Sequence, residues 1–401
     1  MNKIPVIQRA CFLLFALGQP LGHGQDAIPL PDVVGTPSVR TRSVEVSGQP
    51  AQLVGLASRM VDLHGGLKRV SDGGDFTLRF TAEGPNSVNL TIGSRGKVLW
   101  QGDFSGDSQL EALYAAGDAA VMKTLGIPGF FQSKVAFVSD RTGHPEIYTA
   151  DMLFQKVRQL TRDAAQCLSP NLSPDGRKLL YTSYHRTGFP DIYQIDLATG
   201  QRRIFAGFKG TNTGATHSPD GRMVAMILSS SGNSEVYLSN AEGGQLRRLT
   251  RSTSLEADPS WSPDGRRLVF TSDQMGGPQI YTMDVQGRST SRVRTDISRN
   301  CSEPAWNPRD AGQIAFTAAM GGEFEVALYS FKENRSRVLS TGAGDAVHPA
   351  WLNDGRHLIY TERTSRYNRL VLIDSVTGEK SRFSPVELNN AREVSPVYTG
   401  G

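Results

Sequence analysis

Three titratable residues recur at one position of a long internal repeat: Asp258, Glu303 and His348. They lie 45 residues apart, and a proline follows each of them. Because proline restricts the backbone, each side chain is presented from a stiff support. Two carboxylates and an imidazole that meet in space can bind polar groups of a partner or coordinate a cation. The alternative is that they are solvated loop-tip residues that cap turns.

The sequence lacks the residue patterns of the common hydrolases. It has no Gly-x-Ser-x-Gly elbow for a nucleophilic serine and no His-Glu-x-x-His helix for zinc. Of its histidines, His217 and His348 stand shortly before a repeat marker, but they occupy different repeat positions. Two such histidines are too few for a closed metal site. We therefore predict no enzyme activity, no cofactor and no metal centre.

The repeat itself is marked by the string Ser-Pro-Asp-Gly-Arg, which begins at residues 173, 218 and 262. Weaker copies surround Pro308 and Asp354. We take the proline of the string, or the residue that replaces it, as the repeat marker. The markers then stand at 174, 219, 263, 308 and 353, in steps of 44 or 45 residues. The Asp-Gly pair tolerates the positive φ values of a tight hairpin turn. A calcium loop is disfavoured because no Asp-x-Asp-x-Asp-Gly pattern surrounds these pairs.

Each marker precedes an apolar strand, a polar turn and a second strand, as in residues 178–182 and 191–193. A first copy without a marker occupies 134–138 and 146–148, which makes six copies. The recurring Trp261, Trp306 and Trp351 are expected to pack between blades. A period of this length is typical of four-stranded blades, so the sequence predicts a mainly β fold with a six-bladed β-propeller over residues 127–401.

The C-terminal run from Glu393 to Tyr398 matches the strand from Glu256 to Trp261 that opens a blade. Since the first blade lacks an opening strand, we expect the C-terminus to supply it and to close the ring. The residues five before each marker then converge on the entrance of the central channel. We predict that they form a partner-binding channel mouth, made by Ser169, Gly214, Asp258, Glu303, His348 and, from the closing strand, Ser395.

Two cysteines, Cys167 and Cys301, remain after an N-terminal signal is removed, and two cysteines in an exported protein invite a disulfide interpretation. Both lie seven residues before their markers, in blades two and five, which face each other across the ring. A disulfide requires Cα atoms within about 7 Å. We therefore predict two free thiols.

The first 126 residues divide into three segments. Residues 1–24 are predicted to be a signal peptide, because Lys3 and Arg9 precede a short apolar run that ends before Gly18. Residues 25–49 are polar and Pro-rich and are expected to be a flexible leader. Residues 50–126 predict a small α/β domain, with a helix from Leu53, three strands between 76 and 102, and a second helix after Ser108.

The charge pattern excludes one class of partner. Charged residues make up 20% of the chain and the formal net charge is +4, without any basic block. A nucleic-acid surface needs clustered Lys and Arg with interleaved aromatics, so none is expected. No segment after the signal is apolar for long enough to cross a membrane, and we expect a monomer in the periplasm.

The signal peptide, the small α/β domain, the hinge Gly126-Ile-Pro-Gly-Phe-Phe131 and the Ser-Pro-Asp-Gly-Arg blades together resemble the TolB family of the Tol–Pal envelope system. The resemblance covers residues 50–401 and is most specific in blades such as Pro259 to Gly265. It implies contact with the peptidoglycan-associated lipoprotein at the channel mouth. The family's N-terminal segment that contacts TolA has no recognised counterpart between residues 25 and 50, so no TolA contact is carried over.

The repeat pattern predicts a protein-binding propeller, and the resemblance implies that it is periplasmic, contacts envelope partners and serves outer-membrane integrity and cell division. The alternative from another class is a propeller whose channel holds a small molecule or a metal ion, with Asp258, Glu303 and His348 around it. A propeller enzyme is the third possibility. Metal dialysis and calorimetry with the lipoprotein domain distinguish the first two, since one fold serves many functions.

Overall fold

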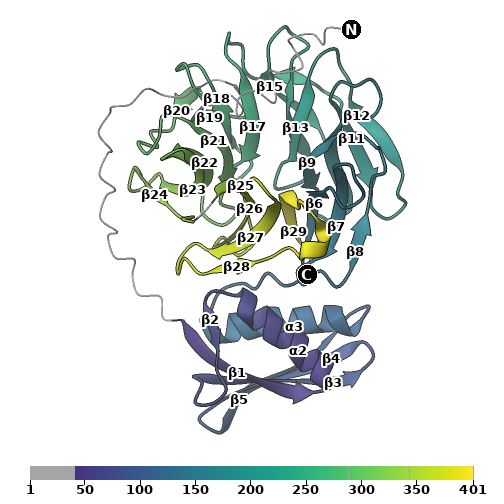
Figure 1. The fold of residues 1–401 in the computed structure, drawn as a ribbon, viewed down its shortest axis with the longest axis vertical. Helices are drawn as coiled ribbons and strands as arrows, with labels where there is room; N and C mark the ends of the chain where they lie inside the picture. Colours follow the sequence, from purple (N-terminus) through teal and green to yellow (C-terminus); the bar gives the residue numbers. More distant parts are fainter. Residues whose placement is uncertain (1–40, 288, 343, 401) are drawn as a thin grey trace. The chain divides into compact units, whose positions relative to one another are not determined.

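A computed structural model describes residues 41–400, apart from 288 and 343. The predicted signal peptide and the part of the predicted leader before residue 41 lie outside the described residues. Within the described range, no helix is both long and apolar enough to cross a membrane. The described residues form one α/β sheet domain followed by six four-stranded sheets (Figure 1).

The small domain is a five-stranded sheet with two helices, and its strand order is β2-β1-β3-β4-β5. β1 pairs in parallel with both β2 and β3, and the rest of the sheet is antiparallel. Its elements in chain order are β1 (Arg42–Gln49), α2 (Ala51–Leu63), β2 (Leu67–Arg69), β3 (Phe76–Gly84), β4 (Ser87–Ser94), β5 (Lys97–Ser105) and α3 (Gln109–Leu125).

The predicted boundary at residue 50 is wrong, because β1 lies inside the sheet and not in a leader. Only Val44 and Val46 mark this strand as apolar, and the polar residues around them hide the pattern. Val44 is fully buried. The predicted helices are confirmed, and Ser108 caps α3 by accepting a hydrogen bond from the backbone amide of Glu111.

The propeller consists of six blades, as predicted from the repeat. Blade one contains β6 (Ser133–Ser139), β7 (Glu146–Asp151) and β8 (Val157–Gln159). Blade two contains β9 (Cys167–Leu172), β10 (Lys178–Ser183), β11 (Asp191–Asp196) and β12 (Arg202–Ala206). Blade three contains β13 (Asn212–His217), β14 (Met223–Leu228), β15 (Glu235–Asn240) and β16 (Arg247–Arg248).

The remaining blades follow the same order of four antiparallel strands. Blade four contains β17 (Glu256–Trp261), β18 (Arg267–Ser272), β19 (Gln279–Asp284) and β20 (Thr290–Arg292). Blade five contains β21 (Cys301–Trp306), β22 (Gln313–Met320), β23 (Glu323–Ser330) and β24 (Arg335–Val338). Blade six contains β25 (Asp345–Trp351), β26 (His357–Arg363), β27 (Asn368–Asp374) and β28 (Lys380–Arg382), and a short 3-10 helix, η2 (Val386–Leu388), follows.

The ring is closed by β29 (Arg392–Tyr398), which pairs with β6 and completes blade one. This confirms the predicted closure by the C-terminus. The closing strand also contacts the small domain, because the Tyr398 hydroxyl lies 3.1 Å from Oδ2 of Asp118 in α3. Oδ1 of Asp118 accepts the backbone amide of Phe131 at 2.7 Å.

Neighbouring blades are joined by the tryptophans that the sequence singled out. Trp261 and Trp351 are buried, and each indole donates to a backbone carbonyl of the preceding blade, at Thr216 and Ala305 respectively. Trp306 is also buried, but its indole donates to Ala311 within its own blade. The predicted packing role is confirmed, and two of these side chains add a directional hydrogen bond to it.

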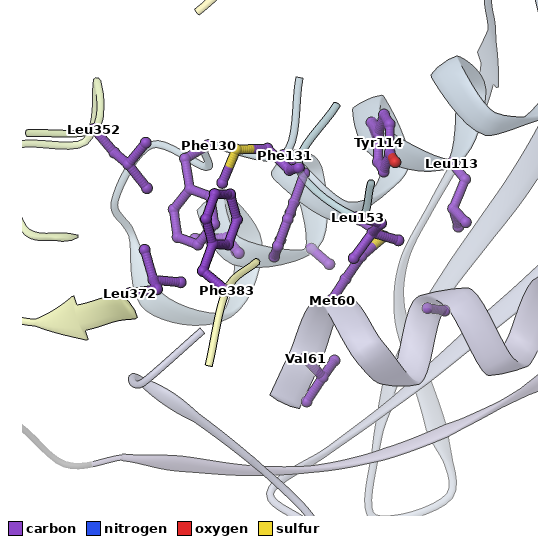
Figure 2. Close-up of a cluster of buried hydrophobic side chains, with 14 of the residues drawn as sticks. Met60, Val61, Leu113, Tyr114, Phe130, Phe131, Leu153, Leu352, Leu372 and Phe383 are labelled. Atoms are coloured by element: carbon purple, nitrogen blue, oxygen red, sulfur yellow. The ribbon is translucent and has the colours of Figure 1, made fainter. Parts of the chain in front are cut away.

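The hinge after α3 contributes aromatic side chains to a core that continues from the small domain into blades one and six. Phe130 is fully buried and Phe131 nearly so. Figure 2 shows them near Met60 of α2 and near Leu352, Leu372 and Phe383 of the propeller. Aromatic side chains of this size contribute several kcal/mol each when they are buried, so this core holds the small domain to the ring.

The two cysteines are free and buried, as predicted. Burial raises the pKa of the Cys167 thiol to about 12 and that of Cys301 to about 11. Thiols of this kind stay protonated and behave as small apolar side chains.

Two buried carboxyl groups meet between blades three and four. Glu235 is fully buried and Glu256 is 3% exposed. Arg248 donates to Glu235 at 2.5 Å, whereas Glu256 receives hydrogen bonds from the hydroxyls of Ser252 and Ser272. Burial and the adjacent Glu235 carboxylate raise the pKa of Glu256 to about 7. Glu256 therefore binds its proton more tightly in the folded chain than in the unfolded one.

We predict that removal of residues 391–401 lowers the melting temperature by roughly 10 °C, because the inner edge of blade one loses its partner strand and several kcal/mol of burial. Thermal unfolding followed by circular dichroism measures the change. Removal of residues 400 and 401 alone serves as the control, since it leaves β29 intact. An unchanged melting temperature in the longer deletion contradicts the closing role of β29.

We also predict that the stabilising contribution of Glu256 is complete below the ordinary glutamate pKa of 4.5 and is lost as the pH rises through about 7. Between pH 5 and 8 the free energy of unfolding of the parent should fall by roughly 2–3 kcal/mol more than that of Glu256→Gln, measured with denaturant. Glu242→Gln, at an exposed carboxylate, is the matched control. Parallel pH profiles of parent and Glu256→Gln refute the prediction.

Candidate functional site: the channel mouth

A β-bulge interrupts the innermost strand of every blade near its start. One residue of each bulge has a positive φ between 48° and 60°, in the left-handed region. These bulge residues are Ser169, Gly214, Asp258, Glu303, His348 and Glu393. All but the glycine adopt a conformation that costs roughly 1 kcal/mol, so the fold imposes the same strained turn on different side chains.

The sequence placed Ser395 at this position, and that assignment is wrong: the sixth bulge residue is Glu393. Glu393 and Val394 lie between the pairs Arg392–Val138 and Ser395–Ala136, as Asp258 and Pro259 do between the corresponding pairs of blade four. The proline misled the alignment, because Pro396 stands three residues after its bulge residue and not one. Ser395 is instead buried, and its hydroxyl accepts the Leu172 amide of blade two at 3.0 Å.

The bulge residues connect one blade to the next. Oε2 of Glu303 accepts the backbone amide of His348 at 2.8 Å, and Oε1 lies 3.2 Å from Nε2 of the same histidine. Oε2 of Glu393 accepts the amide of Ser169 at 2.6 Å, which joins the closing strand to blade two. The glutamates therefore support the ring as well as lining its entrance.

Threonines of the second strands form hydrogen bonds with two of the bulge residues. The amide of Glu303 donates to Thr271, and the amide of Glu393 donates to Thr361, both at 3.1 Å. Thr317 donates to Oε2 of Glu303 at 2.7 Å. These bonds satisfy polar groups that the bulge leaves out of the strand ladder.

The acidic side chains influence one another's protonation. Burial and the carboxylates of Glu303 and Glu393 raise the pKa of Asp258 to about 6, although His348 opposes this. For His348, burial lowers the pKa, but the nearby carboxylates of Glu303, Glu393 and Asp258 outweigh it and raise the pKa. Mutual effects of this kind show that Asp258, Glu303, His348 and Glu393 converge at one place.

The predicted residues differ in what they offer to a ligand. The His348 side chain is 39% exposed and Asp258 is half-buried, so both are accessible. Glu303 is only 8% exposed and is occupied by its hydrogen bonds. Ser169 and Gly214 are half-buried and small, and they leave the entrance open on the side of blades two and three.

The cation alternative is not supported by the spacing of these groups. Among residues 41–400 that the structure describes, the set whose ligand atoms lie mutually within 4.8 Å is His64, Asp354 and His357, which belongs to another part of the fold. Asp258, Glu303 and His348 do not form such a set.

Exposed apolar side chains surround the mouth, and the sequence analysis missed them. In each blade, the loop before the first strand and the loop between the second and third strands lie at the end where the channel opens. Five large side chains in such loops are 39–66% exposed, and we call them the apolar rim: Phe189, Phe208, Met275, Tyr367 and Val386. The sequence signal that could have predicted this rim is the presence of large apolar residues in the turns of the repeat.

Comparison with known proteins agrees with this architecture. A family described as "TolB beta propeller domain" matches residues 121–395. The crystal structure of TolB from Acinetobacter baumannii matches with a TM-score of 0.80 at 22% identity, over 91% of this chain and 98% of that chain. At this identity the likeness shows the fold.

Sequence relatives carry corresponding names. A "Tol-Pal system protein TolB" from Desulfosudis oleivorans is 40% identical over 135 residues, 33% of this chain and 30% of the relative. One from Bordetella pertussis is 34% identical over 156 residues, 38% of this chain and 35% of the relative. The alignments thus span about a third of these relatives' lengths. Because the family match covers most of the propeller, the chain belongs to the TolB β-propeller family.

Proposed function

We propose that this chain is a periplasmic protein-binding propeller of the Tol–Pal type, and that its channel mouth receives a partner protein. The observation that carries the proposal is the combination of accessible polar residues at the centre with the apolar rim around them. The bulge of His348 is fixed by Glu303 of the neighbouring blade, which accepts its backbone amide, and Asp258 forms a hydrogen bond with Thr271 of its own blade. Such preorganised groups lose little conformational freedom on binding.

The arrangement matches the anatomy of a protein interface. Binding energy concentrates in a few central residues, and surrounding apolar contacts exclude water from them. Phe189 and Phe208 lie on loops of blades two and three, the two blades whose bulge residues are the small Ser169 and Gly214. A partner loop that enters the mouth there meets both aromatic side chains and reaches the carboxylates beyond them.

We propose the peptidoglycan-associated lipoprotein as this partner, on the basis of family membership and of the relatives named as Tol-Pal system proteins. A role in outer-membrane integrity and cell division rests on the same basis. We propose binding and not catalysis, because the most buried acid of the mouth, Glu303, is engaged in holding His348 and Thr317. A monomer is the form that we expect to bind.

The first test compares mouth variants by calorimetry with the lipoprotein's soluble domain. We predict that Asp258→Asn, His348→Ala and Phe208→Ala are each folded and that at least one weakens binding roughly 30-fold, as truncation at an interface centre does. Glu303→Gln is expected to lower stability as well, because two hydrogen bonds to its carboxylate weaken.

The matched control is Arg222→Ala, because that side chain is 86% exposed and lies in the hairpin at the other end of blade three. Arg202 is unsuitable, since its guanidinium pairs with the buried Asp163. If the parent binds the lipoprotein domain and the three mouth variants bind it with the same affinity, the site lies elsewhere on the chain.

The second test uses pH. The pKa of Asp258 is about 6, so acidification from pH 7.5 to 5 removes its negative charge and converts a hydrogen-bond acceptor into a donor. We predict that partner affinity falls over this range and that Asp258→Asn reduces the fall, measured by calorimetry at both pH values. Both proteins carry His348→Gln in this comparison, because the Asp258 carboxylate raises the pKa of His348 and its replacement would otherwise change the titration of the histidine. Identical pH profiles exclude Asp258 from the contact.

A further inference from the structure

A second group of ionisable side chains lies away from the mouth, at the junction between the small domain and blade six. His64 ends α2, and Asp354 and His357 flank the turn between β25 and β26. The two histidines have no exposed surface, and the Asp354 side chain has none either. Their imidazole rings are 4.5 Å apart between centroids, with an angle of 63° between the ring planes.

Each histidine has one ring nitrogen that is buried without a hydrogen-bond partner, Nε2 in both cases. In His357 the other nitrogen is engaged: Nδ1 lies 2.6 Å from Oδ2 of Asp354. Asp354 is itself held, because its Oδ1 accepts the backbone amides of Arg356 and His357, both at 3.0 Å. This arrangement keeps the ring proton of His357 on Nδ1 and leaves a lone pair on Nε2.

The surroundings are buried and partly aromatic, and the charge of one of the two nearby acids is paired. Phe130 is stacked on His64 at 5.4 Å between centroids and lies 4.8 Å from His357. Asp374 approaches Nε2 of His357 to 3.7 Å, but its charge is matched by two contacts with the Arg356 guanidinium. Two buried nitrogens without partners are costly in such a place, so a ligand that occupies them both is favoured.

We propose that His64, Asp354 and His357 form a buried site for a divalent transition-metal ion, and that zinc fits it best. Imidazole nitrogens are zinc ligands, and a carboxylate behind a ligating histidine, as Asp354 stands behind His357, is the usual second contact at such sites. One ligand atom from each of the three residues lies within 4.8 Å of the others. Zinc–nitrogen bonds of about 2.0–2.1 Å require the two imidazoles to move closer together.

Two glycines after His64 let this segment of the chain pack closely against blade six. The Gly66 amide lies 3.2 Å from Nδ1 of His64, so the ring carries its proton on Nε2 in this arrangement. Metal binding through Nε2 moves that proton to Nδ1 and gives up the contact with Gly66. Gly65 packs so tightly on Asp374 that a Cβ there lies 2.5 Å from the Asp374 Cβ, so the segment approaches blade six as closely as a backbone can.

The site draws one ligand from each domain, His64 at the end of α2 and His357 in the blade six hairpin, with Asp354 behind His357. A metal bound there therefore holds the small domain to the ring in addition to the aromatic core. Because the ligands come together only in the folded chain, metal binding adds directly to the stability of this junction.

The experiment uses the untagged chain from residue 25 onward, freed of metal with a chelator. Zinc chloride at about 100 times the dissociation constant should raise the melting temperature by roughly 5 °C. Cobalt(II) should give the intense visible absorption of a tetrahedral site, and zinc should remove it. His64→Gln and His357→Gln should abolish both signals. If His357→Gln does not fold, His64→Gln and the cobalt spectrum of the parent decide.

The matched control is His217→Gln. His217 is also buried with an unpartnered Nε2, but its Nδ1 lies 2.8 Å from Asn171 and no second imidazole is near it in blade three. This variant should keep the zinc and cobalt signals. Absence of a melting shift and of cobalt absorption in the parent overturns the proposal, as does a zinc response that survives in both His64→Gln and His357→Gln.

Discussion

The pairing of β29 with β6 is the interaction on which the remainder of the propeller depends. Without it, blade one keeps three strands, and its inner edge faces the channel with unpaired backbone groups. The same strand carries Glu393 to the amide of Ser169 and Ser395 to the amide of Leu172, so it also fixes the position of blade two. Through Tyr398 and Asp118 it reaches α3 and the hinge. One strand of the C-terminus thus sets the ring, the mouth and the junction with the small domain.

The mouth illustrates how a repeat can keep its backbone while its side chains change. All six bulges have the same left-handed turn, yet the residues are serine, glycine, aspartate, two glutamates and histidine. In two of the bulges the backbone amide of the glutamate donates to a second-strand threonine, so the backbone and not the side chain makes this contact. In blades five and one the glutamates still serve the ring. In blade four and blade six the side chains remain accessible, which is why Asp258 and His348 are the best candidates for partner contacts.

The blade count, the closing strand and the free cysteines were predictable, because a period of 44 or 45 residues records the ring directly in the sequence. Ser395 was misplaced because proline position is a weaker guide to register than the bulge, which only backbone geometry reveals. β1 was missed because two valines among polar residues do not look like a buried strand. The apolar rim and the His64–His357 pair arise from segments distant in sequence, and no local pattern connects them.

Blade six connects the two proposed sites through a single strand. β25 has His348 near its start, at the mouth, and ends at Trp351, just before the turn that carries Asp354 and His357. Two bonds fix the strand to β21 of blade five, one from the His348 amide to Glu303 and one from the Trp351 indole to Ala305. A ligand at one site changes the affinity of the other site only if it binds more tightly to one conformation of β25 than to another. The effect on affinity is then equal in both directions. The number and direction of these bonds favour a single conformation of β25. We therefore expect ligand binding at the mouth and metal binding at the domain junction to be independent of each other.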